Sequence, residues 1–163
     1  MMMKVSDYVE IIQKTAVYPK QVNNFGVAYC YMGLEDELNE VIDKSQTGGT
    51  EKEVEDEIGD CLWYVCALCN ELNISFDTVL KNRTANPTNY KVEMPGIFKK
   101  FYRDNKPINT EVVSRELTYI VYQLCEHLSE DKILEILENN YNKLMKRRET
   151  NTLHGDGDYR HNT

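Results

Sequence analysis

The sequence lacks long hydrophobic runs, an excess of basic side chains and any clear strand pattern. None of its apolar stretches approaches the roughly 18–20 residues that a transmembrane helix requires. With 27 acidic and 19 basic side chains, the net charge is −8. Nucleic-acid grooves and proteins that bind anionic membranes need an excess of lysine and arginine. We therefore expect neither a nucleic acid nor a membrane as a partner.

The first residues, MMMKVSDYVEII, contain no signal-peptide core, which predicts a cytoplasmic location. The cysteine count of five is odd, and most of these residues lie in apolar helical patterns, as reduced core thiols do. Cys66 and Cys69 form a C-x-x-C pair, but neither a second pair nor a histidine lies nearby. We interpret them as small apolar helix residues and not as metal ligands.

The absence of strand alternation predicts an all-α fold. Apolar spacing, caps and breaks predict helices over about residues 5–16, 23–45, 50–72, 75–83, 95–103, 110–128 and 129–148. The predicted N-caps are Ser6 or Asp7, Thr50, Ser75, Thr110 and Ser129, and Thr50 with Glu53 forms a capping box.

The chain length suits a single helical domain over residues 1–148 with a polar C-terminal tail over residues 149–163. One helix, from about residue 61 to 72, is apolar almost all round and should be buried on most sides. A single layer of helices would not cover it, so we expect at least a dimer.

Two short acidic tetrads lie in the most acidic part of the chain. ELNE carries Glu37 and Glu40, and EIGD carries Glu57 and Asp60. Residues three apart share one face of a helix, so each like-charged pair slightly destabilises its own helix. Glu57 and Asp60 lie two or three turns inside their helix, too far from its N-terminus for the helix dipole to favour them.

The linker between the two acidic helices is short and contains Gly48 and Gly49. We therefore expect the helices to be antiparallel neighbours whose acids face each other. Facing carboxylates in a helix bundle can hold Mg²⁺, which prefers oxygen ligands and keeps waters that phosphates can replace. A solvated acidic surface is the alternative, because the whole region is rich in acids.

The residues around the tetrads resemble the MazG-like family of all-α nucleoside triphosphate pyrophosphohydrolases. The resemblance rests on TAVYP, GLEDELNEV and EIGDCLWY in that order, with the family's E-x-x-E and E-x-x-D pairs. NNYNKLMKR has the family's Asn-x-x-Lys-Leu-x-x-Arg spacing, and HGDGDYR resembles the tail of short, often phage-borne members. The similar parts are about residues 8–82 and 130–160. The resemblance implies an antiparallel helix bundle completed by oligomerisation, as a homodimer or homotetramer.

The resemblance also implies an activity, the Mg²⁺-dependent hydrolysis of a nucleoside triphosphate to the monophosphate and pyrophosphate. The expected substrate is a deoxynucleoside triphosphate, and the expected role is control or cleansing of the nucleotide pool. We expect that Mn²⁺ can substitute for Mg²⁺. The implied metal ligands are Glu37, Glu40, Glu57 and Asp60. The cation would polarise the phosphoryl oxygens and lower the pKa of the attacking water, and Glu40 could accept the proton of that water.

The substrate contacts that the resemblance implies are Lys44, Trp63, Asn140, Lys143, Arg147 and Arg160. Several have a plainer interpretation: the lysines and Arg147 as basic helix ends, and Trp63 as a core residue. The tail, with Arg160, is predicted to close over the bound triphosphate. It also contains a lone histidine, His154, to which we assign no functional role.

Two features depart from the family pattern. Asn39 precedes Glu40 where the family often has glycine, and Ala85 stands where a lysine is expected after Asn82. Because the lysine reappears at Lys143, residues 84–129 resemble an insertion. A non-catalytic nucleotide-binding or dimerisation protein with the same scaffold, or a phosphoribosyl-ATP pyrophosphohydrolase, would fit the same layout. The sequence does not indicate which nucleobase the substrate carries.

Overall fold

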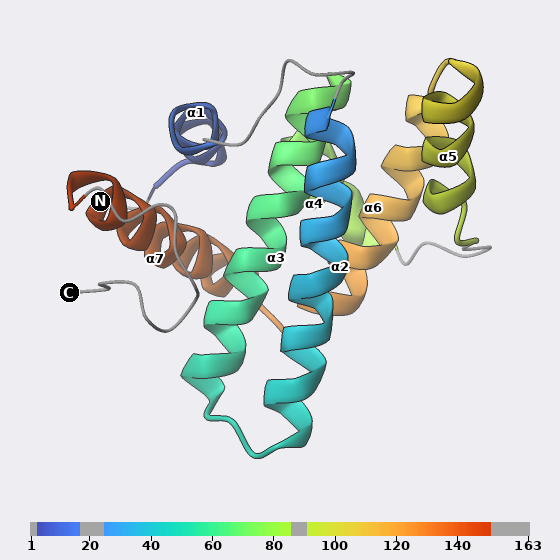
Figure 1. The fold of residues 1–163 in the computed structure, drawn as a ribbon. Coiled ribbons are helices and arrows are strands. Elements are labelled where there is room, and N and C mark those ends of the chain that lie inside the picture. The colour runs from blue at the N-terminus through green and yellow to red at the C-terminus, as the bar shows by residue number, and fades with distance from the viewer. Residues whose placement is uncertain (1–2, 17–24, 86–90, 151–163) are drawn as a thin grey trace.

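The computed structural model describes residues 3–16, 25–85 and 91–150, and these residues form helices with no strand among them. The predicted all-α fold is therefore confirmed. Figure 1 shows a central pair of long helices, α2 and α3, with the other helices packed around it. The elements are α1 (Val5–Thr15), α2 (Phe25–Gln46), α3 (Glu51–Leu72), α4 (Phe76–Asn82), the 3-10 helix η1 (Arg83–Ala85), α5 (Met94–Asp104), α6 (Thr110–Cys125) and α7 (Glu130–Glu149).

The turn between α2 and α3 makes these two helices antiparallel neighbours, as predicted. Gly48 has a φ of 78°, and the Gly49 N–H donates to the Lys44 carbonyl at 2.9 Å, which ends α2. The capping box that begins α3 is also confirmed. The Thr50 hydroxyl accepts from the Glu53 N–H at 3.1 Å, and the Glu53 carboxylate accepts from the Thr50 N–H at 2.8 Å. The acids on α2 therefore face those on α3.

Two of the predicted N-caps are wrong by a few residues. Lys4 is the N-cap of α1, and Asp7 instead accepts a hydrogen bond from the Lys4 N–H at 3.2 Å. Asn109 caps α6, because its side-chain oxygen accepts from the Val112 N–H at 3.3 Å, so Thr110 is already helical. The predicted caps Ser75 and Ser129 are confirmed.

Helix α3 is the centre of the core. It packs against α2 on one side and against α7, α1, α6 and α4 on the others. The side chains of Cys61, Leu62, Val65 and residues 66–69 are all 0% exposed within a single chain. The expected burial of this segment is confirmed, but the argument that a second subunit must cover it is wrong. Oligomerisation remains a prediction from the family resemblance.

In the segment predicted to be an insertion, residues 84–129, the described residues are anchored to the bundle. Its helix α6 packs against α4, η1 and α3. The buried Glu116 carboxylate on α6 accepts from the N–H groups of Glu93 and Met94, which fixes the start of α5. At the other end of α5, the Tyr102 hydroxyl accepts from the Ala28 N–H on α2 at 3.0 Å.

All five cysteines are buried, as predicted for core thiols. Burial raises the pKa of the Cys69 thiol to about 12 and that of Cys66 well above its usual value, so neither is a ready thiolate. Within the described residues, no helix combines the length and apolarity needed to cross a membrane.

Candidate metal centre

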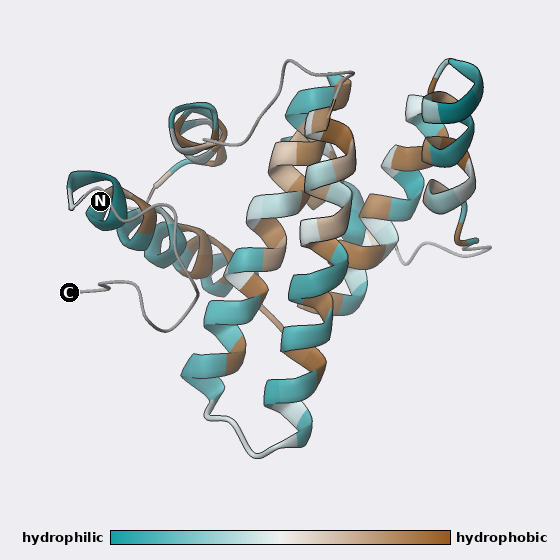
Figure 2. Cartoon of the chain, viewed as in Figure 1, coloured by the Kyte–Doolittle hydropathy of each residue, from teal (hydrophilic) through white to brown (hydrophobic). Residues whose placement is uncertain are grey.

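Three of the four predicted acidic ligands converge between α2 and α3. Glu37, Glu57 and Asp60 each offer a carboxylate oxygen, and these oxygens lie within 4.8 Å of one another. All three side chains are half-buried. The cluster lies in the half of the α2–α3 pair next to the connecting turn, which Figure 2 shows as mainly hydrophilic. The helical spacing that places Glu57 and Asp60 on one face of α3 thus turns both toward α2.

Crowding of these carboxylates makes the cluster electrostatically costly without a cation. Burial, and then the charges of Asp60, Glu57 and Asp36, raise the pKa of Glu37 to about 8, against a smaller opposing effect of Lys143. Burial, followed by the charge of Asp60, also raises the pKa of Glu57. A divalent cation at this position would offset the repulsion that raises both pKa values.

Glu40, the fourth predicted ligand, is not part of this group of three. Its side chain is exposed, one turn along α2 from Glu37. It nevertheless lies near the cluster, since its charge contributes to the raised pKa of Glu57. Glu40 therefore borders the site on its solvent side, where a group that accepts a proton from water would be accessible.

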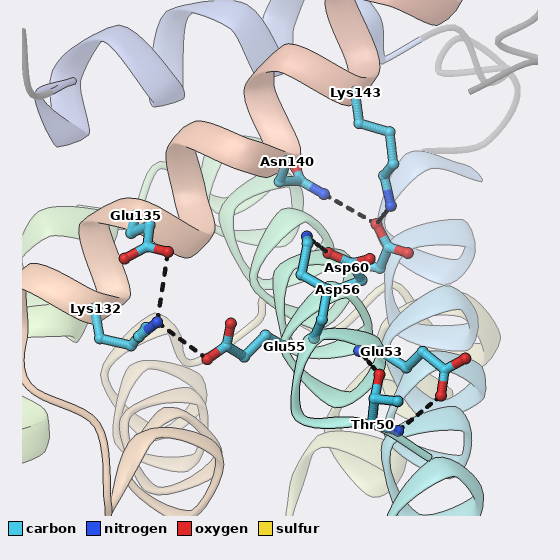
Figure 3. Close-up of polar contacts among 10 residues, drawn as sticks. Thr50, Glu53, Glu55, Asp56, Asp60, Lys132, Glu135, Asn140 and Lys143 are labelled. Atoms are coloured by element: carbon cyan, nitrogen blue, oxygen red, sulfur yellow. Dashed lines mark hydrogen bonds and ion pairs between the residues drawn. The ribbon is translucent and has the colours of Figure 1, made fainter. Parts of the chain in front are cut away.

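Helix α7 completes the site from the far end of the sequence. Asp60 Oδ1 accepts one hydrogen bond from Asn140 Nδ2 at 2.9 Å and another from Lys143 Nζ at 2.6 Å (Figure 3). The oxygen of the same Asn140 amide accepts from the Tyr8 hydroxyl at 2.8 Å. Asn140 and Lys143 were expected from the family spacing, whereas sequence reasoning missed Tyr8. The only signal for Tyr8 was its position on the apolar face of the first helix.

The remaining residues that were predicted to contact the substrate differ in how close they lie to the carboxylates and in how deeply they are buried. Lys44 is half-buried, and its charge lowers the pKa of Glu57, which places it near the cluster. Trp63 packs edge to face on Tyr64, with ring centroids 4.9 Å apart, and against the core. Arg147 is only 6% exposed, so most of it lies inside the bundle. Arg160 and His154 lie outside the described residues.

A cavity of about 330 Å³ opens between α3 and α7 beside the carboxylates. Asn140 and Lys143 line it, so the groups that hold Asp60 are also walls of the cavity. Asn139, Asn142 and Lys146 add further polar groups. The volume is at the lower end of the range for pockets that bind small molecules.

Several charged side chains in and beside this cavity are paired with each other. Lys52 forms an ion pair with Asp56 at 2.5 Å, and Lys132 lies 3.3 Å from the buried Glu55 and 3.4 Å from Glu135 (Figure 3). The floor of the cavity includes Gly59, where an added Cβ would lie 3.4 Å from atoms of Asn140 and Ile136. That distance is an ordinary van der Waals contact, so α7 packs directly on α3 at this position.

The donor set fits a hard divalent cation. Carboxylate oxygens suit Mg²⁺ and Mn²⁺, whereas a zinc site would favour histidine or cysteine ligands. The nearest thiol, Cys61, is fully buried, and burial raises its pKa far above the usual range. Three carboxylates also leave room for waters and for the phosphate oxygens of a substrate.

No curated protein and no solved structure matches the chain. One protein-family model does match: the MazG nucleotide pyrophosphohydrolase domain, over residues 29–86. The matched segment extends from α2 through η1 and contains Glu37, Glu57 and Asp60, while α1 and α7 lie outside it. Over residues 29–86, about a third of its length, the chain is therefore similar to the MazG nucleotide pyrophosphohydrolase domain.

Proposed function

We propose that the protein hydrolyses a nucleoside triphosphate to the monophosphate and pyrophosphate with the help of Mg²⁺. The observation that carries this proposal is the convergence of Glu37, Glu57 and Asp60 inside the segment that matches the MazG domain. Nucleotide pyrophosphohydrolase activity is what the family match supports in general. The metal, the deoxynucleotide preference and a role in controlling the nucleotide pool are parts of our proposal.

The three carboxylates would hold the cation, with Glu40 at their solvent edge. The bound metal would supply Lewis-acid polarisation of the phosphoryl oxygens and a lowered pKa for the attacking water. Water would attack the α-phosphorus, the bond from that phosphorus to the bridging oxygen would break, and pyrophosphate would leave. Glu40, exposed beside Glu57, would accept the proton of the water. Mn²⁺ would serve in place of Mg²⁺ because it accepts the same oxygen ligands.

Lys143 would change partner when substrate and metal bind. Its ammonium group neutralises Asp60 at 2.6 Å, and both side chains are partly buried. A cation bound to Asp60 would take over that role, which would free Lys143 to donate to a phosphate oxygen. Because Lys143 also lines the cavity between α3 and α7, we propose that this cavity takes up part of the substrate.

The amide groups of Asn139 and Asn142 would then face the nucleoside part of the substrate. An amide carries both a donor and an acceptor, which suits the edge of a base or a sugar hydroxyl. Lys44, on the α2 side of the carboxylates, would meet the terminal phosphates. The closure of the tail over the substrate stays a prediction, because the tail lies outside the described residues.

A panel of ribo- and deoxynucleoside triphosphates, with phosphoribosyl-ATP and inorganic tripolyphosphate included, tests the proposal. The expected result is release of pyrophosphate and monophosphate from at least one nucleotide, abolished by a chelator and restored by Mg²⁺. Glu57→Gln should abolish turnover, while Glu51→Gln, an exposed acid in the first turn of the same helix, should not. Undiminished activity after exhaustive chelation, or in Glu57→Gln, would overturn the proposal. Nucleotide binding without turnover of any substrate would instead favour the non-catalytic alternative.

A further inference from the structure

We propose that Tyr8 is a positioning residue of the metal centre, which acts through Asn140 to set the orientation of Asp60. The inference rests on the proposed function, because it concerns how Asp60 presents itself to a cation. Tyr8 lies on α1 and Asn140 on α7, so both residues lie outside the segment that matches the MazG domain.

The contact is a chain of two hydrogen bonds, of which the first is buried and the second is partly buried. Tyr8 is 0% exposed and Asn140 is 4% exposed. The Tyr8 hydroxyl donates to Asn140 Oδ1 at 2.8 Å, and Asn140 Nδ2 donates to Asp60 Oδ1 at 2.9 Å. Water has little access to Tyr8 and Asn140, so the bond between them lacks a ready substitute.

The Tyr8 hydroxyl holds the Asn140 amide in the orientation that Asp60 requires. An amide has a donor end and an acceptor end, and only the donor end can bond to a carboxylate. With the Tyr8 hydroxyl donating to Oδ1, the amide nitrogen is directed to Asp60. Burial keeps the pKa of Tyr8 well above its ordinary value, so the hydroxyl retains its proton.

This arrangement assigns different roles to the two oxygens of Asp60. Oδ1 already accepts from Asn140 and from Lys143. Both of these hydrogen bonds are made to Oδ1, and neither is made to Oδ2. The second oxygen is thereby left for a cation shared with Glu37 and Glu57, and Asp60 is held in the rotamer that offers it.

The aromatic ring of Tyr8 has a separate, structural role. It packs in the core beside Phe76, with ring centroids 6.0 Å apart, and phenylalanine could fill the same space. The hydroxyl, and not the ring, makes the hydrogen bond to Asn140. Replacing Tyr8 by phenylalanine therefore removes the proposed function of the residue and keeps its packing.

The experiment compares Mn²⁺ binding by the wild type and Tyr8→Phe, measured by calorimetry and by the electron paramagnetic resonance of free Mn²⁺. Loss of a direct partner of a metal ligand, here Asn140, typically weakens metal affinity by about 10- to 100-fold. Tyr8 lies one hydrogen bond farther from the metal, so we expect Tyr8→Phe to weaken Mn²⁺ binding by about 10-fold, at the lower end of that range. For Tyr8→Phe acting on a nucleotide that the wild type hydrolyses, kcat at saturating metal should approach the wild-type value. The metal concentration that gives half-maximal rate should rise. Tyr141→Phe is the matched control, because it removes the hydroxyl of a half-buried tyrosine on α7 that lines a different cavity, beside α1.

Asn140→Leu supplies a second route to the same conclusion. It should weaken Mn²⁺ binding at least as much as Tyr8→Phe, and the double variant should bind no more weakly than Asn140→Leu, because both changes break one chain. Wild-type Mn²⁺ affinity in Tyr8→Phe, with its circular dichroism unchanged, would overturn the positioning role, as would additive losses in the double variant. If the wild type binds Mn²⁺ and Tyr8→Phe binds it weakly, but no nucleotide is hydrolysed, the proposed function fails and the positioning role stands.

Discussion

Metal binding by this protein should depend steeply on pH, because one of the three carboxylates must lose a proton first. Burial and the neighbouring carboxylates raise the pKa of Glu37 to about 8. At neutral pH the metal-free protein therefore carries a proton on Glu37, and a cation must displace it. Below pH 8 the apparent affinity should increase with pH, and above it the increase should level off.

The size of this effect follows from the fraction of Glu37 that is ionised. For a pKa of about 8, that fraction rises about eightfold between pH 6.5 and pH 7.5, and the apparent affinity for Mg²⁺ should rise by a similar factor. Calorimetry in two buffers of different ionisation enthalpy would measure both the affinity and the number of protons released, which we expect to approach one at pH 6.5.

Two variants distinguish the effect of Glu37 on metal binding from the effect of the general negative charge of the region. Glu37→Gln should bind metal weakly and with much less dependence on pH, whereas Asp43→Asn, an exposed acid farther along α2, should behave like the wild type. An affinity that stays constant from pH 6.5 to 7.5, with no proton released, would refute the electrostatic reasoning.

The same raised pKa predicts how the metal-free protein responds to pH. A carboxyl whose pKa is higher in the folded state than in the unfolded state stabilises the fold below about pH 4.5, and this contribution is lost as pH rises toward about 8. The melting temperature without metal should fall over that window, and saturating Mg²⁺ should reduce the fall.

Four further predictions concern stability and assembly. Gly33→Ala should lower the free energy of unfolding by about 1–3 kcal/mol in urea titrations, because the added Cβ would lie 2.1 Å from the Tyr64 ring. Gly96→Ala, in a helix with no atom within 4 Å of the added Cβ, should instead raise it by about 0.5–1 kcal/mol. Mg²⁺ at a hundred times its Kd should add about 2.7 kcal/mol to the free energy of unfolding, and a chelator should reverse this. Light scattering should show a homodimer or homotetramer; a monomer at micromolar concentration would contradict that expectation.

Much of the site's location followed from local sequence. The helical period places Glu57 and Asp60 on one face of α3, and the Gly48–Gly49 turn directs that face to α2. The helical periodicity could not show that Glu37 and Glu40 differ in burial, because the two residues share one face of α2. Their difference in burial depends on how the two helices cross, and that depends on contacts such as Gly33 against Tyr64.

The parts that the sequence did not reveal depend on contacts between distant residues. Tyr8 and Asn140 are 132 positions apart, and no local pattern indicates that a core tyrosine reaches the partner of an acidic ligand. Likewise, the apolar surface of α3 correctly predicted burial but not what covers it. Helices from both ends of the chain cover it, because α1 and α7 pack on α3 and on each other. Composition could not distinguish this arrangement from a subunit interface.

The most direct test of the central claim is a crystal structure of the protein grown with Mn²⁺ and a non-hydrolysable nucleoside triphosphate analogue. The account predicts an anomalous difference peak within ligand distance of carboxylate oxygens from Glu37, Glu57 and Asp60, with the triphosphate extending toward Lys143. An anomalous peak elsewhere, with the three carboxylates free of metal in the presence of bound nucleotide, would contradict it.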